Sequence, residues 1–306
     1  MNNTLGDLQT FARAAELGSL TRAAQALGLT PSAVSRSLQR LEERLHTRLL
    51  YRTTRNVSLT EEGTRFHARL LQLFSDLEEA EAEARGQPGY VSGTLRISTF
   101  TAFGPHQLLH LLPEFTRRHP ALKIDLDFSD RRVDLVAEGI DVAIRLGALG
   151  DSSLMARKIA WTTRVICASP AYIARKGMPK VPADLAAHDC LAFRDPGLVH
   201  LNDWPFDTPS GRIAVPVSGP IIAGDGDTVF RLAEAGLGIG RLSRFVAEAG
   251  LREGRLVPLL SAFEVQEQTP LHVVYPHRKH LPPKVSAFIE FLVESFGAVP
   301  PWERRV

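Results

Sequence analysis

The sequence has few cysteines and no long apolar run, and these shortages exclude several classes of protein. Cys167 and Cys190 are the only two cysteines among 306 residues, too few for a disulfide framework or a cysteine-based zinc cluster. No segment approaches the roughly 20 apolar residues that span a bilayer, so no membrane association is expected. The first residues also lack a basic stretch followed by an apolar core. No export signal is therefore expected, and a reducing cytoplasm fits best.

The usual catalytic motifs are missing as well. The sequence contains no G-x-S-x-G elbow, no Walker motif and no H-E-x-x-H. Gly236–Gly240 is glycine-rich but does not match G-x-G-x-x-G, and the ten histidines are dispersed, His277 and His280 included. With 44% hydrophobic and 23% charged residues, the composition is that of an ordinary globular protein. We therefore expect no enzyme, no cofactor and no metal site.

Charge is distributed unevenly along the chain. Residues 1–60 contain no lysine and carry eight arginines against four acidic residues, whereas residues 61–86 carry three arginines against seven acidic residues. The remainder is close to neutral. Guanidinium groups bind phosphates in a bidentate manner, so a basic head indicates a nucleic-acid partner. The whole chain prefers arginine, with 30 arginines against 6 lysines, and this preference explains why the basic residues of the head are arginines. It does not explain why they cluster in the head.

The basic head has the pattern of a helix-turn-helix. Apolar residues from Leu5 to Ala15 recur at helical spacing, and Gly18-Ser19 interrupts them. A short second helix is predicted over Thr21–Leu27, with Gly28 as a left-handed cap. Thr30-Pro31 then begins a third helix, as N-cap and first-turn proline. A tight turn of this kind places the third helix in a DNA major groove.

The third helix is predicted to be amphipathic. Its apolar stripe consists of Val34, Leu38, Leu41 and Leu45, and its opposite face of Ser32, Arg36, Gln39, Arg40 and Glu43. The N-terminal residues should reach bases, and Arg40 should meet phosphate. A merely solvated polar face is the alternative. The candidate DNA contacts of the helical part of the head are Ser19, Thr21, Thr30, Ser32, Ala33, Ser35, Arg36 and Arg40.

A short hairpin is predicted next. Leu50 and Val57–Leu59 form its strands around a polar tip, Thr53–Asn56, and Arg52 and Arg55 are free to lie in or along a minor groove. An ordinary exposed hairpin is the alternative. Its place beside the reading helix favours a wing that contacts DNA.

These motifs together resemble the DNA-binding region of LysR-type transcriptional regulators. The resemblance rests on Ala23-Ala24, Thr30-Pro31-Ser32-Ala33-Val34-Ser35, Leu41-Glu42, Leu45, Arg52-Thr53-Thr54-Arg55 and Leu59-Thr60-Glu61-Glu62-Gly63. Glu138–Arg145 is also typical of that family. The resemblance implies a winged helix-turn-helix, a long linker helix, a two-lobed effector domain like periplasmic binding proteins, and dimers usually paired into tetramers. His46 stands where the family usually has glycine, and Leu50-Tyr51 replaces a Phe-led pair. A small geometric change, not lost DNA binding, is expected from His46.

The acidic segment is predicted to be a dimerising helix. Apolar residues follow a heptad seam, whose candidate contacts are Phe66, Leu70, Leu73 and Leu77, continued by Ala80 and Ala84. A helix that packs on its own domain is the alternative. Arg85–Gly89 ends the helix as a hinge.

The remaining residues are predicted to form an α/β sensor. Strands are expected over 94–98, 122–128, 141–145, 164–168 and 271–275, with another beginning at 238–240, and helices over 108–118, 132–138, 229–234 and 283–296. The alternation indicates parallel βαβ units in both lobes. The predicted fold class is α/β with an N-terminal all-α winged helix-turn-helix and a two-lobed effector domain. The predicted domains are 1–60 with the helix-turn-helix at 21–40, the linker 61–88, and the effector domain 89–306, with lobe I at 92–163 plus 268–298 and lobe II at 164–267.

An effector is expected in the crevice between the lobes, beyond the carboxyl ends of the strands. The turn Ser98–Thr101 follows a strand, and the His200–Asp203 loop and Gly224–Thr228 are the facing candidates. The expected contacts are Ser98, Thr99, Phe100, Thr101, Arg145, His200, Asn202, Gly226 and Thr228. In the alternative, Ser98 and Thr101 only cap a helix. Asp227 is expected to be an N-cap, and the acidic residues near it suggest that the effector need not be an acid.

The sequence therefore predicts a DNA-binding regulator that a small molecule switches. Its expected partners are double-stranded DNA, the small-molecule effector, further copies of the chain in a homodimer or homotetramer, and RNA polymerase. The alternative is a cytoplasmic solute-binding or dehydratase-like α/β protein with an accessory helical domain. The missing export signal and the missing acid/base residues count against that alternative.

Overall fold

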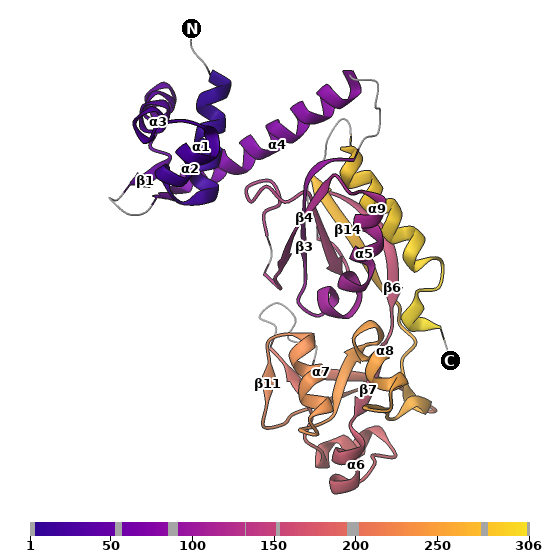
Figure 1. Cartoon of the computed structure of the whole chain (residues 1–306). Coiled ribbons are helices and arrows are strands. Elements are labelled where there is room, and N and C mark those ends of the chain that lie inside the picture. Colours follow the sequence, from indigo (N-terminus) through magenta and orange to yellow (C-terminus); the bar gives the residue numbers. More distant parts are fainter. Residues whose placement is uncertain are drawn as a thin grey trace.

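The computed structural model describes residues 4–52, 57–84, 91–131, 133–150, 154–194, 202–276 and 281–304. Three parts follow one another along the chain (Figure 1): a small helical head, the long helix α4, and two α/β lobes stacked end to end. The head and α4 lie to one side of the lobes. No helix among the described residues is long and apolar enough to cross a membrane.

The head is a bundle of α1 (Thr4–Leu17), α2 (Leu20–Leu27) and α3 (Pro31–Leu45). Its core is formed by side chains that share complete or near-complete burial: Phe11, Ala14, Ala23, Ala24, Val34, Leu38 and Leu41. The small residues of α2 allow the close approach that the sequence predicted. Leu45 was predicted to belong to the apolar stripe of α3, and this is wrong, because 37% of it is exposed at the end of the helix.

The helix ends of the head are capped by their own side chains. Ser19 accepts from the Arg22 N–H at 3.4 Å and so starts α2 one residue earlier than predicted. Gly28 closes α2 at φ 65°, and Thr30 accepts from the Ala33 N–H at 3.2 Å. His46 closes α3 in the left-handed conformation at φ 49°, where the resemblance implied a glycine. The prediction that histidine fits this cap is confirmed.

A two-stranded hairpin follows α3. Strands β1 (Leu50–Arg52) and β2 (Val57–Leu59) pair in antiparallel register, as predicted. The Glu42 carboxylate accepts from the Leu49 and Leu50 N–H groups at 2.9 and 3.1 Å, so α3 fixes the first strand directly. The predicted tip, 53–56, lies outside the described residues.

Helix α4 (Glu61–Ala84) begins against the head. The Thr60 hydroxyl accepts from the Gly63 N–H at 2.9 Å and donates to the Arg48 carbonyl at 2.8 Å. At Gly63 the helix lies so close that a Cβ would stand 2.0 Å from the Leu49 carbonyl oxygen. Farther along, Leu70 is buried in the head core, and the Phe66 ring lies 5.6 Å from that of Phe11.

Lobe I contains one five-stranded sheet in the order β4-β3-β5-β14-β6. Its strands are β3 (Gly93–Thr99), β4 (Leu122–Phe128), β5 (Val142–Leu146), β6 (Leu154–Thr162) and β14 (Thr269–Pro276). Strand β3 is parallel to β4 and β5, whereas β14 is antiparallel to β5 and β6. Three helices bury their apolar faces in the main core: the π-helix η1 (Gly104–Leu108), α5 (Leu109–Arg118) and α9 (Pro283–Phe296). The short η5 (Pro301–Glu303) follows α9.

Lobe II lies between β6 and β14 in the sequence. Its elements are β7 (Arg164–Ala168), α6 (Pro170–Lys176), η2 (Pro182–Ala187), β8 (Ala192–Phe193), β9 (Asp203–Thr208), β10 (Gly211–Pro216), β11 (Ile222–Ala223), α7 (Gly226–Glu234), β12 (Gly240–Ser243), α8 (Arg244–Arg252), β13 (Val257–Pro258) and η4 (Ser261–Phe263). The β9–β10 hairpin places Trp204 and Phe206 in a separate core with Ile166 of β7.

Two predictions about the sensor are wrong. Residues 132–138 were expected to be helical, but the described part, 133–138, forms a turn. There Asp134 accepts from the Val136 and Ala137 N–H groups at 3.0 Å, and Gly139 takes φ 67°. Purely parallel units were expected in both lobes, but β12 and β13 are antiparallel to β7. In lobe I, β14, the strand that returns from lobe II, is likewise antiparallel to its neighbour β5.

Gly63→Ala should destabilise the head. The added methyl group collides with the Leu49 backbone, which cannot yield as a flexible side chain would. Overpacking of this kind costs about 1–3 kcal/mol. Urea unfolding followed by circular dichroism should show the loss, whereas Gly150→Ala, which adds a methyl group with no atom within 4 Å, should unfold like the unchanged protein. Equal stability of both variants would contradict the close approach of α4.

Candidate DNA interface and effector cleft

The N-terminal end of α3 presents small polar groups and one unpaired arginine. Thr30 and Ser32 are exposed and their hydroxyls lie 3.1 Å apart, and Ala33 and Ser35 are half-buried behind them. Arg36 is exposed, and it makes no hydrogen bond or ion pair within the described part of the chain. Its guanidinium is thus available for an outside acceptor.

Arg40 is held differently. Its Nη2 lies 2.6 Å from Oδ1 of the buried Asp7 in α1, and the Ser37 hydroxyl donates to the same oxygen at 2.5 Å. The Arg40 side chain nevertheless stays 54% exposed. Burial raises the pKa of Asp7, but the hydrogen bonds from Arg40 and Ser37 and the nearby positive charges outweigh this and lower that pKa below its ordinary value. The pair fixes the direction in which Arg40 leaves the helix.

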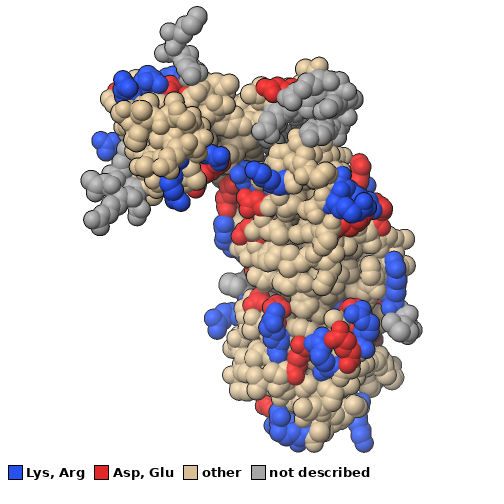
Figure 2. All heavy atoms as spheres, in the orientation of Figure 1, with Lys and Arg blue, Asp and Glu red and all other residues tan. Residues whose placement is uncertain are grey.

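The other predicted DNA contacts surround this helix. Ser19 is the half-buried N-cap of α2, and Thr21 is exposed in its first turn. The side chain of Arg52 and the whole of Arg55 lie outside the described residues. The blue side chains at several places on the head in Figure 2 are all arginines, whereas blue and red alternate over the lobes. A surface rich in one sign of charge attracts a polyanion.

The predicted dimerisation residues divide into two pairs. Phe66 and Leu70 face the head of the same chain, as the alternative reading of the helix proposed for the whole seam. Leu73 and Leu77, one turn and two turns farther on, are 52% and 41% exposed. Exposed leucines at heptad spacing form a natural contact for a second helix.

In lobe I, the turn after β3 is already engaged by the protein itself. Ser98 and Thr99 are fully buried, and Phe100 and Thr101 are half-buried. The Thr101 hydroxyl and N–H both donate to the Asp130 carboxylate. Arg145 lies nearby, with its Nη2 3.5 Å from the Ser98 hydroxyl, and its burial lowers its pKa. An acidic neighbour at Thr101 makes this turn a poor place for an anion.

The start of α7 in lobe II faces this turn. A Cβ on Gly226 would lie 3.2 Å from the Ala102 Cβ, so the two lobes touch here. The N-cap of α7 is Asp225, which accepts from both the N–H and the hydroxyl of Thr228, so the expected N-cap role of Asp227 is wrong. Asp227 instead lies 2.8 Å from His106 Nε2 across the lobes.

The third group of predicted contacts, from the His200–Asp203 loop, is described only in part. Asn202 is half-buried and pairs with the backbone of Phe193, through its Oδ1 at 2.8 Å and its Nδ2 at 3.1 Å. His200 lies outside the described residues. Asn202 thus holds β8 and precedes Asp203, which lines a pocket described next.

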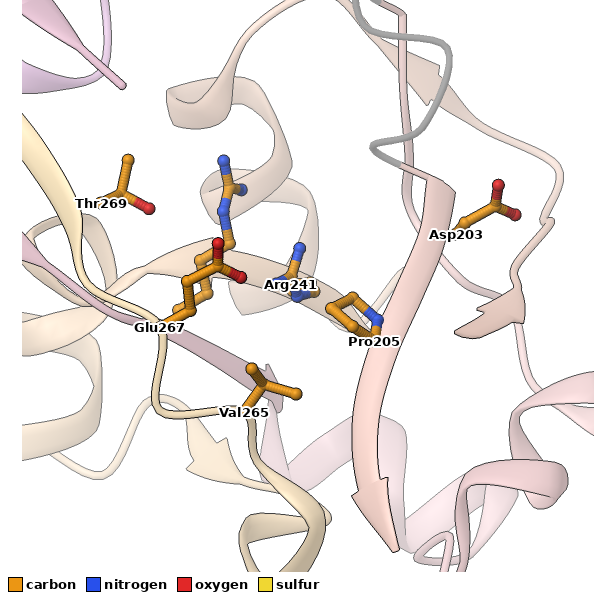
Figure 3. A pocket seen from close by; sticks show the side chains of 7 residues that line it. Asp203, Pro205, Arg241, Val265, Glu267 and Thr269 are labelled. Carbon is orange, nitrogen blue, oxygen red and sulfur yellow. The ribbon is translucent and has the colours of Figure 1, made fainter. Parts of the chain in front are cut away.

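A polar pocket of about 250 Å³ lies where the chain crosses between the lobes. Its lining residues come from β7, β9, β12, β14 and the segment before β14: Arg164, Asp203, Pro205, Arg241, Val265, Glu267 and Thr269 (Figure 3). Of its lining residues, the sequence indicated only Asp203, as the end of the His200–Asp203 loop. A charged residue at the start of a buried strand, as at Arg164, was the signal that could have indicated it.

Matches to two known protein families identify this architecture. Residues 5–64 match the family described as bacterial regulatory helix-turn-helix protein, lysR family, and residues 88–297 match the LysR substrate binding domain. The chain belongs to the LysR family. It is a LysR-type transcriptional regulator with a helix-turn-helix and an effector-binding domain.

Relatives and solved structures agree with this LysR-type assignment over nearly the whole chain. The HTH-type transcriptional regulator CrgA of Neisseria meningitidis is 35% identical over 297 residues, which cover 97% of this chain and 98% of CrgA. The CrgA structure matches with a TM-score of 0.63, covering 94% of this chain and 97% of CrgA. The full-length structure of the virulence activator AphB of Vibrio cholerae, 28% identical, matches with a TM-score of 0.58 and covers 95% and 98% of the two chains.

The two cysteines of this LysR-type regulator are packed in its lobes. Cys167 and Cys190 are buried, and burial raises the pKa of each thiol to about 12. Thiols with such pKa values are poor nucleophiles at neutral pH. No cluster of three or more metal-ligating side chains occurs among the described residues.

Replacing Asp7 with asparagine should weaken the head in a pH-dependent way. The lowered pKa means that Asp7 stabilises the folded head above its ordinary pKa of 3.8, and that this contribution disappears as the pH falls through the lower folded-state value. We expect Asp7→Asn to cost about 1–3 kcal/mol at neutral pH, through lost charge-assisted hydrogen bonds. The difference from the unchanged protein should shrink as the pH falls below 3.8, and it should vanish only below the lowered folded-state pKa of Asp7.

Glu16→Gln is the matched control for Asp7→Asn. Glu16 pairs with Arg13 at 2.8 Å on the exposed side of α1, where ion pairs contribute little. Urea unfolding between acid and neutral pH compares the two variants. A pH-independent loss in Asp7→Asn would show that the ionised carboxylate is not what stabilises the head.

Proposed function

We propose that α3 of this regulator reads DNA sequence in the major groove, while the hairpin β1–β2 lies on the adjacent minor groove. The observation that carries the proposal is the exposed, unpaired Arg36 one turn into a capped helix whose opposite face is buried. An arginine in this position donates two hydrogen bonds to a guanine edge. Ser32, Ala33 and Ser35 border the same contact.

Phosphate contacts surround this reading position in the proposal. Ser19, Thr21 and Thr30 lie at helix N-termini, where backbone N–H groups and the helix dipole favour phosphate. Arg40, oriented by Asp7, and the wing arginines Arg52 and Arg55 add positive charge. These contacts position the head without reading sequence.

Two heads are proposed to act together through α4. Leu73 and Leu77 would pack against the same residues of a second chain, while Phe66 and Leu70 anchor the helix to its own head. Pairing of such dimers into a tetramer is part of the proposal. Two heads held at a fixed spacing would match two half-sites separated by whole turns of DNA.

The switch is proposed to lie between the lobes. A small molecule that binds one lobe arrangement more tightly than another shifts the population toward it, and α4 passes the change to the heads. The residues proposed for its effector cleft are Ser98, Thr99, Phe100, Thr101, Arg145, His200, Asn202, Gly226 and Thr228. Genomic DNA as the target places the protein in the cytoplasm, with RNA polymerase as the partner through which binding acts.

Arg36→Ala should reduce affinity for specific DNA by about 1–3 kcal/mol and relax the preference at one base position. A gel shift on the intergenic DNA upstream of the gene, at several salt concentrations, measures both effects. Arg52→Ala and Arg55→Ala should instead weaken specific and random DNA equally and flatten the salt dependence. Arg13→Ala, which removes an exposed arginine paired with Glu16, is the control. Equal losses on specific and random DNA for Arg36→Ala would remove it from the reading role.

Leu73→Glu should block dimerisation, because it places a charge at the centre of an apolar contact between two helices. Light scattering should then report the mass of a single chain. Leu5→Glu, at an exposed leucine of α1 outside the proposed interface, should leave the mass unchanged. An unaltered mass for Leu73→Glu would place the dimer contact elsewhere.

A further inference from the structure

The pocket between the lobes contains two guanidinium groups on one face of a sheet. Strands β7 and β12 are antiparallel, with Arg164 opposite Ser243 and Arg241 opposite Ile166. Residues opposite each other, and residues two apart in a strand, share a face. Arg164 and Arg241 are therefore diagonal neighbours, and both line the pocket.

Neither guanidinium is neutralised by the protein. Arg164 and Arg241 make no side-chain hydrogen bond or ion pair with any residue that the structure describes. The nearby Glu264 is taken by Arg244, at 3.0 Å. Figure 3 shows Glu267 and Asp203 at opposite sides of the pocket, and both belong to exposed positions.

Burial makes this arrangement costly when the pocket is empty. Burial is the main cause that lowers the pKa of Arg241 to about 10, and the positive charge of Arg164 lowers it further, against the opposing effect of Glu267 and Glu264. Burial also lowers the pKa of Arg164, again opposed by Glu267. Arginine side chains stay protonated in proteins at neutral pH, so two like charges lie close together with no hydrogen-bonded partner among the described residues.

We propose that this pocket binds the carboxylate of a small organic acid between Arg164 and Arg241, and that such an acid is the effector. The inference rests on the proposed switch between the lobes and names the chemical class of its ligand. It places the carboxylate of that ligand in the Arg164–Arg241 pocket instead of the cleft beside the Ser98–Thr101 turn. It replaces the expectation that the effector need not be acidic, which rested on residues near α7. Two guanidinium groups match the two oxygens of a carboxylate.

The size and lining of the pocket limit the acid. A volume of about 250 Å³ lies below the range usual for drug-sized ligands, so the acid is small. The surface of the pocket is almost entirely polar, although Val265 and Pro205 are among the residues that line it. Glu267 reduces the affinity for every anion, and a second negative group near it would be disfavoured.

The first test needs no ligand. Arg164→Met and Arg241→Met each keep the length of the side chain and remove the charge, which relieves repulsion in the empty pocket. In the full chain, we expect each variant to melt at the same temperature as the unchanged protein or higher. Arg212→Met, which breaks the exposed pair with Asp207 at 2.9 Å, is the control. Clear destabilisation confined to the two pocket variants would make the arginines structural and overturn the proposal.

The second test uses small anions at constant ionic strength. Succinate, benzoate and inorganic phosphate are compared with the neutral amides of the two acids, by the rise in melting temperature. We expect at least one carboxylate to stabilise the unchanged protein and the Arg212→Met variant. The affinity of either pocket variant for that carboxylate should be lower by about tenfold or more. Glu267→Gln should raise the affinity. Stabilisation by phosphate alone would assign the site to phosphate, and no anion effect, or an equal effect in all variants, would overturn it.

A gel shift separates this proposal from the function on which it rests. The acid that stabilises the protein should change the DNA affinity of the unchanged chain but not that of Arg241→Met. Specific DNA binding with no response to the acid would overturn its role as effector and leave the regulator intact. No specific DNA binding by the unchanged chain would overturn the reading role of α3, while the melting experiments would still decide the anion site.

Discussion

The seating of α4 against the head is the contact on which the rest of the molecule depends. Gly63 permits the helix to touch the Leu49 backbone, and Thr60 ties its first turn to Arg48. Glu42 of α3 accepts from the Leu49 and Leu50 N–H groups and so holds the same segment. Direct contacts therefore join α3, the hairpin β1–β2 and α4. In the proposed switch, a change of angle at the far end of α4 would be passed through these contacts to Arg36.

Local chemistry explains why the head was predictable and the sensor less so. Caps such as Thr30, Gly28 and even His46 act within a few residues, so sequence alone located three helices and a hairpin. The pair of Arg40 with Asp7 spans 33 positions, and no local pattern signals it. In the lobes, β6 was missed because its partner β14 lies far away in the chain. The β9–β10 hairpin is local, but Pro205 and Pro216 weaken its strand pattern. Asp225 and Asp227 stand two residues apart, and no local signal shows which of them caps α7.

The candidate sites divide in the same way. An exposed arginine on a capped helix is visible in sequence because both the cap and the amphipathic stripe are local. The neighbouring Arg164 and Arg241 are 77 positions apart, and only the antiparallel register of β7 and β12 puts them on one face. Hydroxyl groups directly after a strand indicated the Ser98–Thr101 turn, but Thr101 donates to Asp130 of the same chain. A charged side chain with no partner among the described residues indicates a ligand site better than a hydroxyl after a strand does. Such a side chain can be recognised only when the fold is known.

The position of the pocket gives an acid a means of acting on the lobes. Its lining joins Thr269, at the start of a lobe I strand, to arginines on two lobe II strands. A bound carboxylate that bridges these groups has an affinity that depends on the angle between the lobes. The lobes already touch through His106 with Asp227 and through Gln107, which donates to the Phe245 carbonyl at 2.8 Å. An acid that favours a different angle between the lobes must break these two contacts. The free energy of the two contacts therefore sets how much more tightly the acid must bind the new lobe arrangement than the present one.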